Sequence, residues 1–287
     1  GKDALSVGTS LTQQLAIGSS AGKNTTGSDN VFVGHECGIT NTTGSSNTAI
    51  GHRSFMDNTS GAANTAVGLG ALKANTTGEQ NTGVGRGALY VANGTHHYNT
   101  AVGYYALGAQ TTATRNTAVG RLAGQVLTTG DNNTFIGEQA GLTTTSGANN
   151  VCLGHYATCS SATASNEFTL GNNTTSFLRC NTQTISGLSD SRDKVDVVDL
   201  PAGLKFIDTL RPVKFKWQTR DGNIKDGITS AGFLAQDLQT AQKDSEYLDL
   251  VSNNNPDRLE ARYGNLIPTL VKAIQELSAK VTALEAG

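Results

Sequence analysis

Cysteine, proline and aromatic residues are scarce in this 287-residue sequence, which has four Cys, four Pro, one Met and one Trp. No apolar run approaches the roughly 18 residues that a transmembrane helix needs, so we expect no membrane insertion. The formal net charge of −2 gives no electrostatic basis for binding nucleic acid, which requires a concentrated basic face. We therefore expect neither a membrane protein nor a nucleic-acid partner.

The few cysteines do not have the spacing of a metal site. Cys152 and Cys159 are the only close pair, and the four do not recur at one repeat position. We interpret them as free, half-buried thiols and expect no metal site and no cofactor. The cysteines are Cys37, Cys152, Cys159 and Cys180.

What the chain does have is a hydrophobic residue followed by glycine, recurring at intervals of 16 to 18 residues, most often 17. A period this short is one coil of a solenoid whose neighbouring coils stack along an axis. The pattern stops at Gly171. The ten steps are Ile17-Gly18, Val33-Gly34, Ile50-Gly51, Val67-Gly68, Val84-Gly85, Val102-Gly103, Val119-Gly120, Ile136-Gly137, Leu153-Gly154 and Leu170-Gly171.

Each repeat reads Asn-Thr-Ala-Val-Gly followed by a polar turn such as Thr-Thr-Gly, which is typical of a short strand and a tight bend. The asparagine stands four residues before the glycine, where stacked amides can form a hydrogen-bonded ladder. The residue after each glycine varies freely, so we expect that column to point outward. The asparagines are Asn30, Asn47, Asn64, Asn81, Asn99, Asn116, Asn133 and Asn150.

A coil with so few large apolar side chains is marginally stable alone, because burial at about 25 cal/mol per Å² must outweigh the ordering of 17 residues. The repeats are similar to the heads of trimeric autotransporter adhesins and to repeats of bacteriophage tail fibres, which implies a homotrimer. We predict a mainly β fold, as a solenoid, a β-roll or a triple-stranded β fibre. One chain or three interleaved chains could form each coil.

The only 18-residue coil is the best candidate for a receptor contact, because aromatic rings beside hydrogen-bonding groups suit sugar faces. A tolerated surface insertion is the alternative. A metal bound by adjacent histidines across a trimer axis is disfavoured, since neighbouring side chains rarely converge on one ion. The candidates for binding a host-surface receptor, which we expect to be a carbohydrate, are Tyr90, His96, His97, Tyr98, Tyr104 and Tyr105.

Charge separates the chain into two parts. The first 188 residues carry 8 basic and 8 acidic side chains, whereas the last 99 carry 13 and 15. We expect a repeat fibre over 1–171, a connector over 172–188 and a small α+β domain over 189–287.

The junction carries a motif, Ser-Asp-x-Arg-x-Lys, that starts at Ser189. With the segments 204–217, 231–237 and 263–267, the last 99 residues resemble the intramolecular chaperone auto-processing domain that ends phage tail fibres, tailspikes and endosialidases. The resemblance implies cleavage of the Leu188–Ser189 bond by a Ser–Lys dyad. It makes Ser189 the nucleophile and Lys194 the general base, with Asp190 and Arg192 in support. No histidine lies in 189–287, which excludes a Ser-His-Asp triad within this domain.

The end of the chain predicts a coiled coil over 266–286, because apolar residues alternate there at spacings of 3 and 4. An amphipathic helix packed on its own domain is the alternative, and Pro268 suits a first helical turn. The apolar stripe, called the seam below, consists of Ile267, Leu270, Ile274, Leu277, Val281 and Leu284.

We therefore expect a phage tail-fibre tip in the virion, attached to upstream tail proteins, whose chaperone trimerises and then cuts itself off once without acting on outside substrates. A trimeric bacterial adhesin with a non-cleaving cap is the alternative. A glycan-cleaving tailspike lacks paired carboxylates, an ice-binding solenoid lacks a second threonine column, and a membrane-tethered regulator lacks its DNA-binding domain and membrane span.

Overall fold

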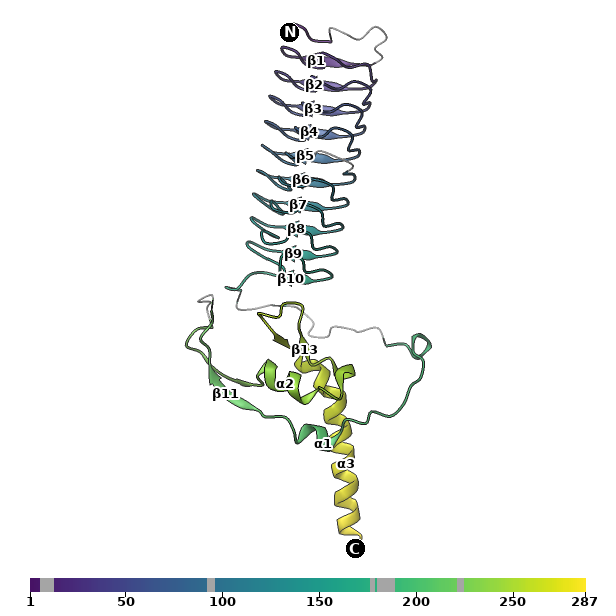
Figure 1. Ribbon diagram of the computed structural model, residues 1–287, viewed down its shortest axis with the longest axis vertical. Coiled ribbons are helices and arrows are strands. Elements are labelled where there is room, and N and C mark those ends of the chain that lie inside the picture. Colours follow the sequence, from purple (N-terminus) through teal and green to yellow (C-terminus); the bar gives the residue numbers. More distant parts are fainter. Residues whose placement is uncertain (6–12, 92–95, 176–178, 180–188, 221–224) are drawn as a thin grey trace. The chain divides into compact units, whose positions relative to one another are not determined.

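Three-residue parallel strands, one per coil, build the N-terminal part of the computed structural model, which describes residues 1–5, 13–91, 96–175, 179, 189–220 and 225–287. The strands stack in chain order as a regular column of coils (Figure 1). Over the residues described, each strand pairs in parallel register with the next strand of the same chain, so the coils are formed by a single chain, and the predicted solenoid is confirmed. The strands are β1 (Leu15–Ile17), β2 (Val31–Val33), β3 (Thr48–Ile50), β4 (Thr65–Val67), β5 (Thr82–Val84), β6 (Thr100–Val102), β7 (Thr117–Val119), β8 (Thr134–Ile136), β9 (Val151–Leu153) and β10 (Phe168–Leu170).

The interior of the solenoid is narrow and is filled by the middle residues of strands β2 to β9 and, in four coils, by a large side chain from the following turn, which is Phe55, Leu72, Leu89 or Leu107. In β4, Ala66 is buried while its neighbours Thr65 and Val67 are half-buried on the outer face. Leu72 turns inward with a φ of 50° and is fully buried. A left-handed backbone costs a residue other than glycine about 1–2 kcal/mol, which the burial of a leucine, worth about 1.5–3 kcal/mol, offsets.

The repeating glycine is required by both its backbone conformation and the spacing of the coils. Gly51 has a φ of 141°, and a Cβ built on it would lie 2.4 Å from the carbonyl oxygen of Gly68 in the next coil. Only glycine meets both demands, which explains the strict period of the sequence.

The predicted asparagine ladder is confirmed and runs through the buried side of the coils. The backbone N–H of Asn47 donates to Oδ1 of Asn30 at 2.9 Å, and the Asn47 amide donates to the carbonyl of Gly61 at 2.9 Å. The same contacts recur up to Asn150. The ladder supplies partners for backbone groups that would otherwise be buried without one.

The last residue of each strand lies on the outer face, so the solenoid presents a continuous apolar column to its surroundings. Members more than a third exposed are Ile17, Ile50, Val102, Val119, Ile136 and Leu170.

The second compact unit, Asn173–Gly287, is a small α+β domain. A two-stranded antiparallel pair, β11 with β12, precedes a second pair, β13 with β14. Its small core includes Leu238, Leu250 and Leu266. The elements are 3₁₀ η1 (Ser191–Asp193), α1 (Leu204–Ile207), β11 (Val213–Lys216), β12 (Thr229–Gly232), α2 (Ala235–Ala241), η2 (Glu246–Leu248), β13 (Val251–Ser252), β14 (Glu260–Ala261), η3 (Tyr263–Leu266) and α3 (Ile267–Glu285).

The long helix α3 packs on its own domain through a face other than the seam. Thr269 and Ala273 are buried, and the carboxylate of Glu276 accepts the Leu204 N–H at 2.8 Å at the start of α1. The six seam residues are 43–81% exposed, so packing on its own domain does not account for the stripe. Among the described helices, none has the length and hydropathy needed to cross a membrane.

Candidate functional site

Ser189 and Lys194 are brought together by a single turn of 3₁₀ helix, η1. The Lys194 ammonium Nζ donates to the Ser189 hydroxyl Oγ at 2.7 Å. The turn is closed by the Lys194 N–H, which donates to the Ser191 carbonyl at 3.2 Å. A serine hydroxyl with an amine in hydrogen-bond contact has the arrangement of a nucleophile and its base. Leu188, on the other side of the expected scissile bond, lies outside the described residues.

Asp190 and Arg192 form an ion pair inside the same turn. The Asp190 carboxylate caps η1 by accepting the Arg192 N–H at 2.9 Å and also accepts from the guanidinium Nη2 at 2.5 Å. The hydrogen bonds from Arg192 hold the pKa of the Asp190 carboxyl below its ordinary value. Asp190 is therefore an ionised carboxylate that is hydrogen-bonded to Arg192. Its role is to shape the turn, and it does not act as a base.

Every residue from 189 to 199 is exposed. The segment includes three valines that would ordinarily be buried, Val195, Val197 and Val198, with exposed fractions of 76–85%. A lysine can act as a base only as the neutral amine, which burial or neighbouring cations favour. In the single chain water reaches both Ser189 and Lys194, so a further surface is needed to enclose them.

The six receptor candidates do not form one surface. Tyr105 contacts Tyr104 edge-on at 4.8 Å and Tyr90 at 5.7 Å between ring centroids. The Arg86 guanidinium lies 5.8 Å from the Tyr104 ring. We call Tyr90, Tyr104, Tyr105 and Arg86 the tyrosine cluster.

His97 and Tyr98 form a separate contact, with ring centroids 5.9 Å apart, and Arg115 lies over the Tyr98 ring at 5.4 Å. This pair comes from the other end of the coil, just before β6. Residues 92–95 of the lengthened coil lie outside the described residues.

His96 is a correction to the sequence prediction, because its side chain is fully buried and cannot touch a receptor from the surface. Its ring lies against Gly78 of the preceding coil, where an added Cβ would meet it at 2.3 Å. The His96 carbonyl accepts a hydrogen bond from the Asn81 side-chain amide at 3.0 Å. In earlier coils the carbonyls of Gly44 and Gly61 accept the equivalent bonds from ladder asparagines. Burial, with the nearby His97, lowers the pKa of His96 to about 4.

The three described cysteines are free and buried, as expected. Burial raises the pKa of the Cys37 thiol to about 12. The Sγ atoms of Cys152 and Cys159 lie 3.4 Å apart, and this contact raises the pKa of Cys152 and lowers that of Cys159 to about 7. Cys180 lies outside the described residues.

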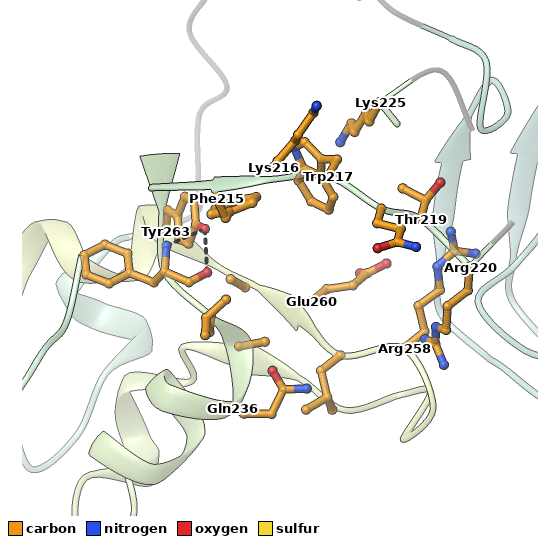
Figure 2. Close-up of a pocket in the computed structure, with 16 residues that line it drawn as sticks. Phe215, Lys216, Trp217, Thr219, Arg220, Lys225, Gln236, Arg258, Glu260 and Tyr263 are labelled. Atoms are coloured by element: carbon orange, nitrogen blue, oxygen red, sulfur yellow. Dashed lines mark hydrogen bonds between the residues drawn. The ribbon is translucent and has the colours of Figure 1, made fainter. Parts of the chain in front are cut away.

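The sequence did not indicate a cavity of about 980 Å³ in the C-terminal domain (Figure 2). Trp217 and Phe215, 5.1 Å apart edge-on, form one wall, and Arg220 and Arg258 lie at the far end. Tyr263 lies at the end of the cavity away from the two arginines. Its hydroxyl accepts the Phe233 N–H at 3.0 Å and donates to the Phe233 carbonyl at 3.1 Å. Among the described lining residues there is no serine or cysteine, and the aromatic rings and two arginines give the cavity the composition of a binding site.

Residues 189–245 match the model of a peptidase family described as chaperone of endosialidase. The match begins at Ser189 and covers the segment that carries the Ser189–Lys194 contact. The resemblance predicted from the sequence is thereby confirmed, and it supports a tail-fibre-type protein with a C-terminal chaperone. The family implies autoproteolytic self-cleavage of that domain. Neither the curated proteins nor the solved structures contain a significant match to this chain.

Proposed function

We propose that this chain is the tip of a phage tail fibre, in which the C-terminal domain trimerises, guides folding of the shaft and then cuts itself off between Leu188 and Ser189. The observation that carries the proposal is the 2.7 Å contact between Lys194 Nζ and Ser189 Oγ at the first residue of the family match. The two groups have the reach and the chemistry of a dyad.

The chemistry needs only the chain itself and one water. Neutral Lys194 accepts the Ser189 Oγ proton while Oγ attacks the Leu188 carbonyl carbon. The C–N bond to Ser189 breaks, and its nitrogen takes the proton. Water then hydrolyses the resulting ester, leaving a carboxylate on Leu188 and the free amine and hydroxyl of Ser189. Arg192 is a candidate to stabilise the developing oxyanion.

Association of several copies supplies the surface that the single chain lacks for enclosing Ser189 and Lys194. The seam of α3 has the spacing of a coiled coil and is exposed, so copies of the domain can bury it against one another. The exposed valines after Lys194 give a second surface for such contacts, and burying them would draw water away from the dyad. Cutting would then follow assembly, which makes it a single maturation step.

The surface of the shaft also favours association of several copies. Its outer column of isoleucine and valine is too apolar to favour permanent exposure over such a length, and parallel shafts held in register by the chaperone would cover it. Because parallel strand pairing is slow and exposes chains to aggregation, a domain that trimerises first, holds three shafts in register and then leaves gives a product that persists through slow unfolding.

Host recognition is assigned to the tyrosine cluster on the shaft. Tyr104 is 43% exposed, and it lies beside Arg86, which can hydrogen-bond sugar hydroxyls. Exposed aromatic rings offer the flat apolar faces that pyranose rings stack on. The alternative, a bacterial surface adhesin with a permanent trimerisation cap, is favoured by the resemblance of the repeats to adhesin heads.

Intact mass spectrometry of freshly purified protein tests the proposal. Wild type should give fragments ending at Leu188 and beginning at Ser189, and both Ser189→Ala and Lys194→Ala should give the uncut chain. Ser191→Ala is the matched control, since it removes an exposed hydroxyl from the same turn and should be cut normally. An uncut wild-type chain in a folded trimer would reject self-cleavage and favour the adhesin.

A further inference from the structure

The outward column that follows each repeating glycine places two histidines on consecutive coils. His35 follows β2 and His52 follows β3 at the equivalent position, and both are exposed. Their rings are stacked, with centroids 5.3 Å apart and planes 17° from parallel. The ring nitrogens of the two histidines are thus held close together, and because lone pairs of nearly parallel rings run side by side, one ring has to turn about its χ angles before both can point at one ion. The other members of the column have exposed side chains as well, which confirms the expected direction of this column.

A carboxylate completes the group. Glu36 Oε2 lies 3.9 Å from His35 Nδ1 and accepts from Arg53 Nε at 2.6 Å. The hydrogen bond from Arg53, with a smaller contribution from the Arg53 charge, lowers the pKa of Glu36 despite an opposing desolvation effect. Glu36 is therefore an anionic oxygen ligand at neutral pH, held beside the two imidazoles by a partner from the next coil.

We propose that His35, His52 and Glu36 bind one divalent transition-metal ion of the kind that imidazole favours, such as Zn²⁺. One ligand atom from each residue lies within 4.8 Å of the other two. Ligands of a tetrahedral Zn²⁺ with bonds of about 2.0–2.2 Å stand about 3.4 Å apart. The group therefore has to contract by about 1.4 Å at most, which χ rotations of the two exposed histidines and the half-buried Glu36 provide, and water completes the coordination.

Selectivity follows from the ligand set. Two imidazoles and one carboxylate suit Zn²⁺, Ni²⁺ or Cu²⁺, whereas Mg²⁺ and Ca²⁺ prefer a shell of oxygen ligands. The ion would link the coils that carry β2 and β3 on their outer surface. This site does not depend on the C-terminal domain or on self-cleavage.

Calorimetric titration of the full chain with ZnCl₂ at pH 7.5 provides the test. One Zn²⁺ should bind per chain, and His35→Gln and His52→Gln should each weaken binding at least tenfold. His155→Gln is the matched control, because His155 occupies the same column with Glu138 in the preceding coil but no second histidine. It should change affinity less than twofold, and MgCl₂ should not compete. Thermal melts of the metal-free variants should coincide with that of wild type, since all three side chains are exposed.

Electron paramagnetic resonance with Cu²⁺ identifies the ligands separately. The nitrogen hyperfine pattern should indicate two imidazoles in wild type and one in either single variant. The proposal is overturned if wild type takes up no Zn²⁺ at millimolar concentration, if His35→Gln leaves the affinity unchanged, or if His155→Gln weakens it equally. If a cysteine bound the Zn²⁺ instead, His35→Gln would leave the affinity unchanged.

Discussion

Removing one amide from the buried asparagine ladder should cost the shaft several kcal/mol. In the structure, Asn116 Oδ1 accepts the backbone N–H of Asn133 at 2.8 Å, and Asn116 Nδ2 donates to the carbonyl of Gly130 at 2.9 Å. The substitution Asn116→Ala deprives both backbone groups of these partners inside a fully buried column. A buried polar group left without its hydrogen bond costs about 1–3 kcal/mol, so the two together predict a loss of about 2–6 kcal/mol.

The assay is denaturant unfolding followed by circular dichroism at fixed protein concentration, with hydrogen exchange to locate the damage. Because each coil contacts only its neighbours, lost protection should centre on the coils joined by Asn99, Asn116 and Asn133. Thr112→Ala, an exposed change in the preceding turn, should stay within about 0.5 kcal/mol of wild type. A loss below 1 kcal/mol for Asn116→Ala, or protection lost evenly along the shaft, would refute the reasoning.

Three further results are expected. His96 has a folded pKa of about 4 against an ordinary value near 6.5, so the unfolded chain binds the proton first as pH falls. Shaft stability should drop by up to about 1.4 kcal/mol per pH unit from 6.5 towards 4, and a His96→Gln variant should lose this part of the slope; an unchanged slope would contradict it. Gly68→Ala, which forces a φ of 131° on alanine and brings Cβ within 2.6 Å of a backbone oxygen, should cost at least 1–3 kcal/mol in the same unfolding assay, whereas Gly264→Ala, with open space around it, should cost far less. Tyr104→Ala should abolish adsorption to host cells without changing the melting temperature, and Tyr156→Ala, an exposed tyrosine elsewhere on the shaft, should not; equal adsorption by both variants would remove the cluster from recognition.

The solenoid could be predicted because its defining interactions repeat. A glycine that alone tolerates both a φ of 141° and a carbonyl oxygen 2.4 Å from its would-be Cβ leaves a strict period in the sequence, as does an asparagine that must bond to the next coil. The outward column is equally visible, because its residues vary directly after an invariant glycine.

Features that break the period could not be predicted. His96 follows a lengthened turn, and only the packing against Gly78 reveals that its ring points inward. The single-chain origin of each coil depends on which strands pair, which periodicity leaves open. The aromatic cavity is built from segments far apart in the chain, so no local pattern marks it. The Ser189–Lys194 pair was found through its family motif, since a serine five residues before a lysine has no distinctive signal alone.

Whether cutting depends on association of the C-terminal domains can be decided by measuring intact mass and light-scattering molar mass on the same samples. Ile274→Asp places a charge in the seam at a side chain that is 66% exposed, so the domain's own core is untouched, and Gln275→Asp is the control beside it. Wild type and the control should be trimers cut before Ser189, and Ile274→Asp should be an uncut monomer of 29.7 kDa. A monomeric Ile274→Asp chain cut as completely as wild type would show that the dyad works without a partner, contrary to the proposed order of assembly and cleavage.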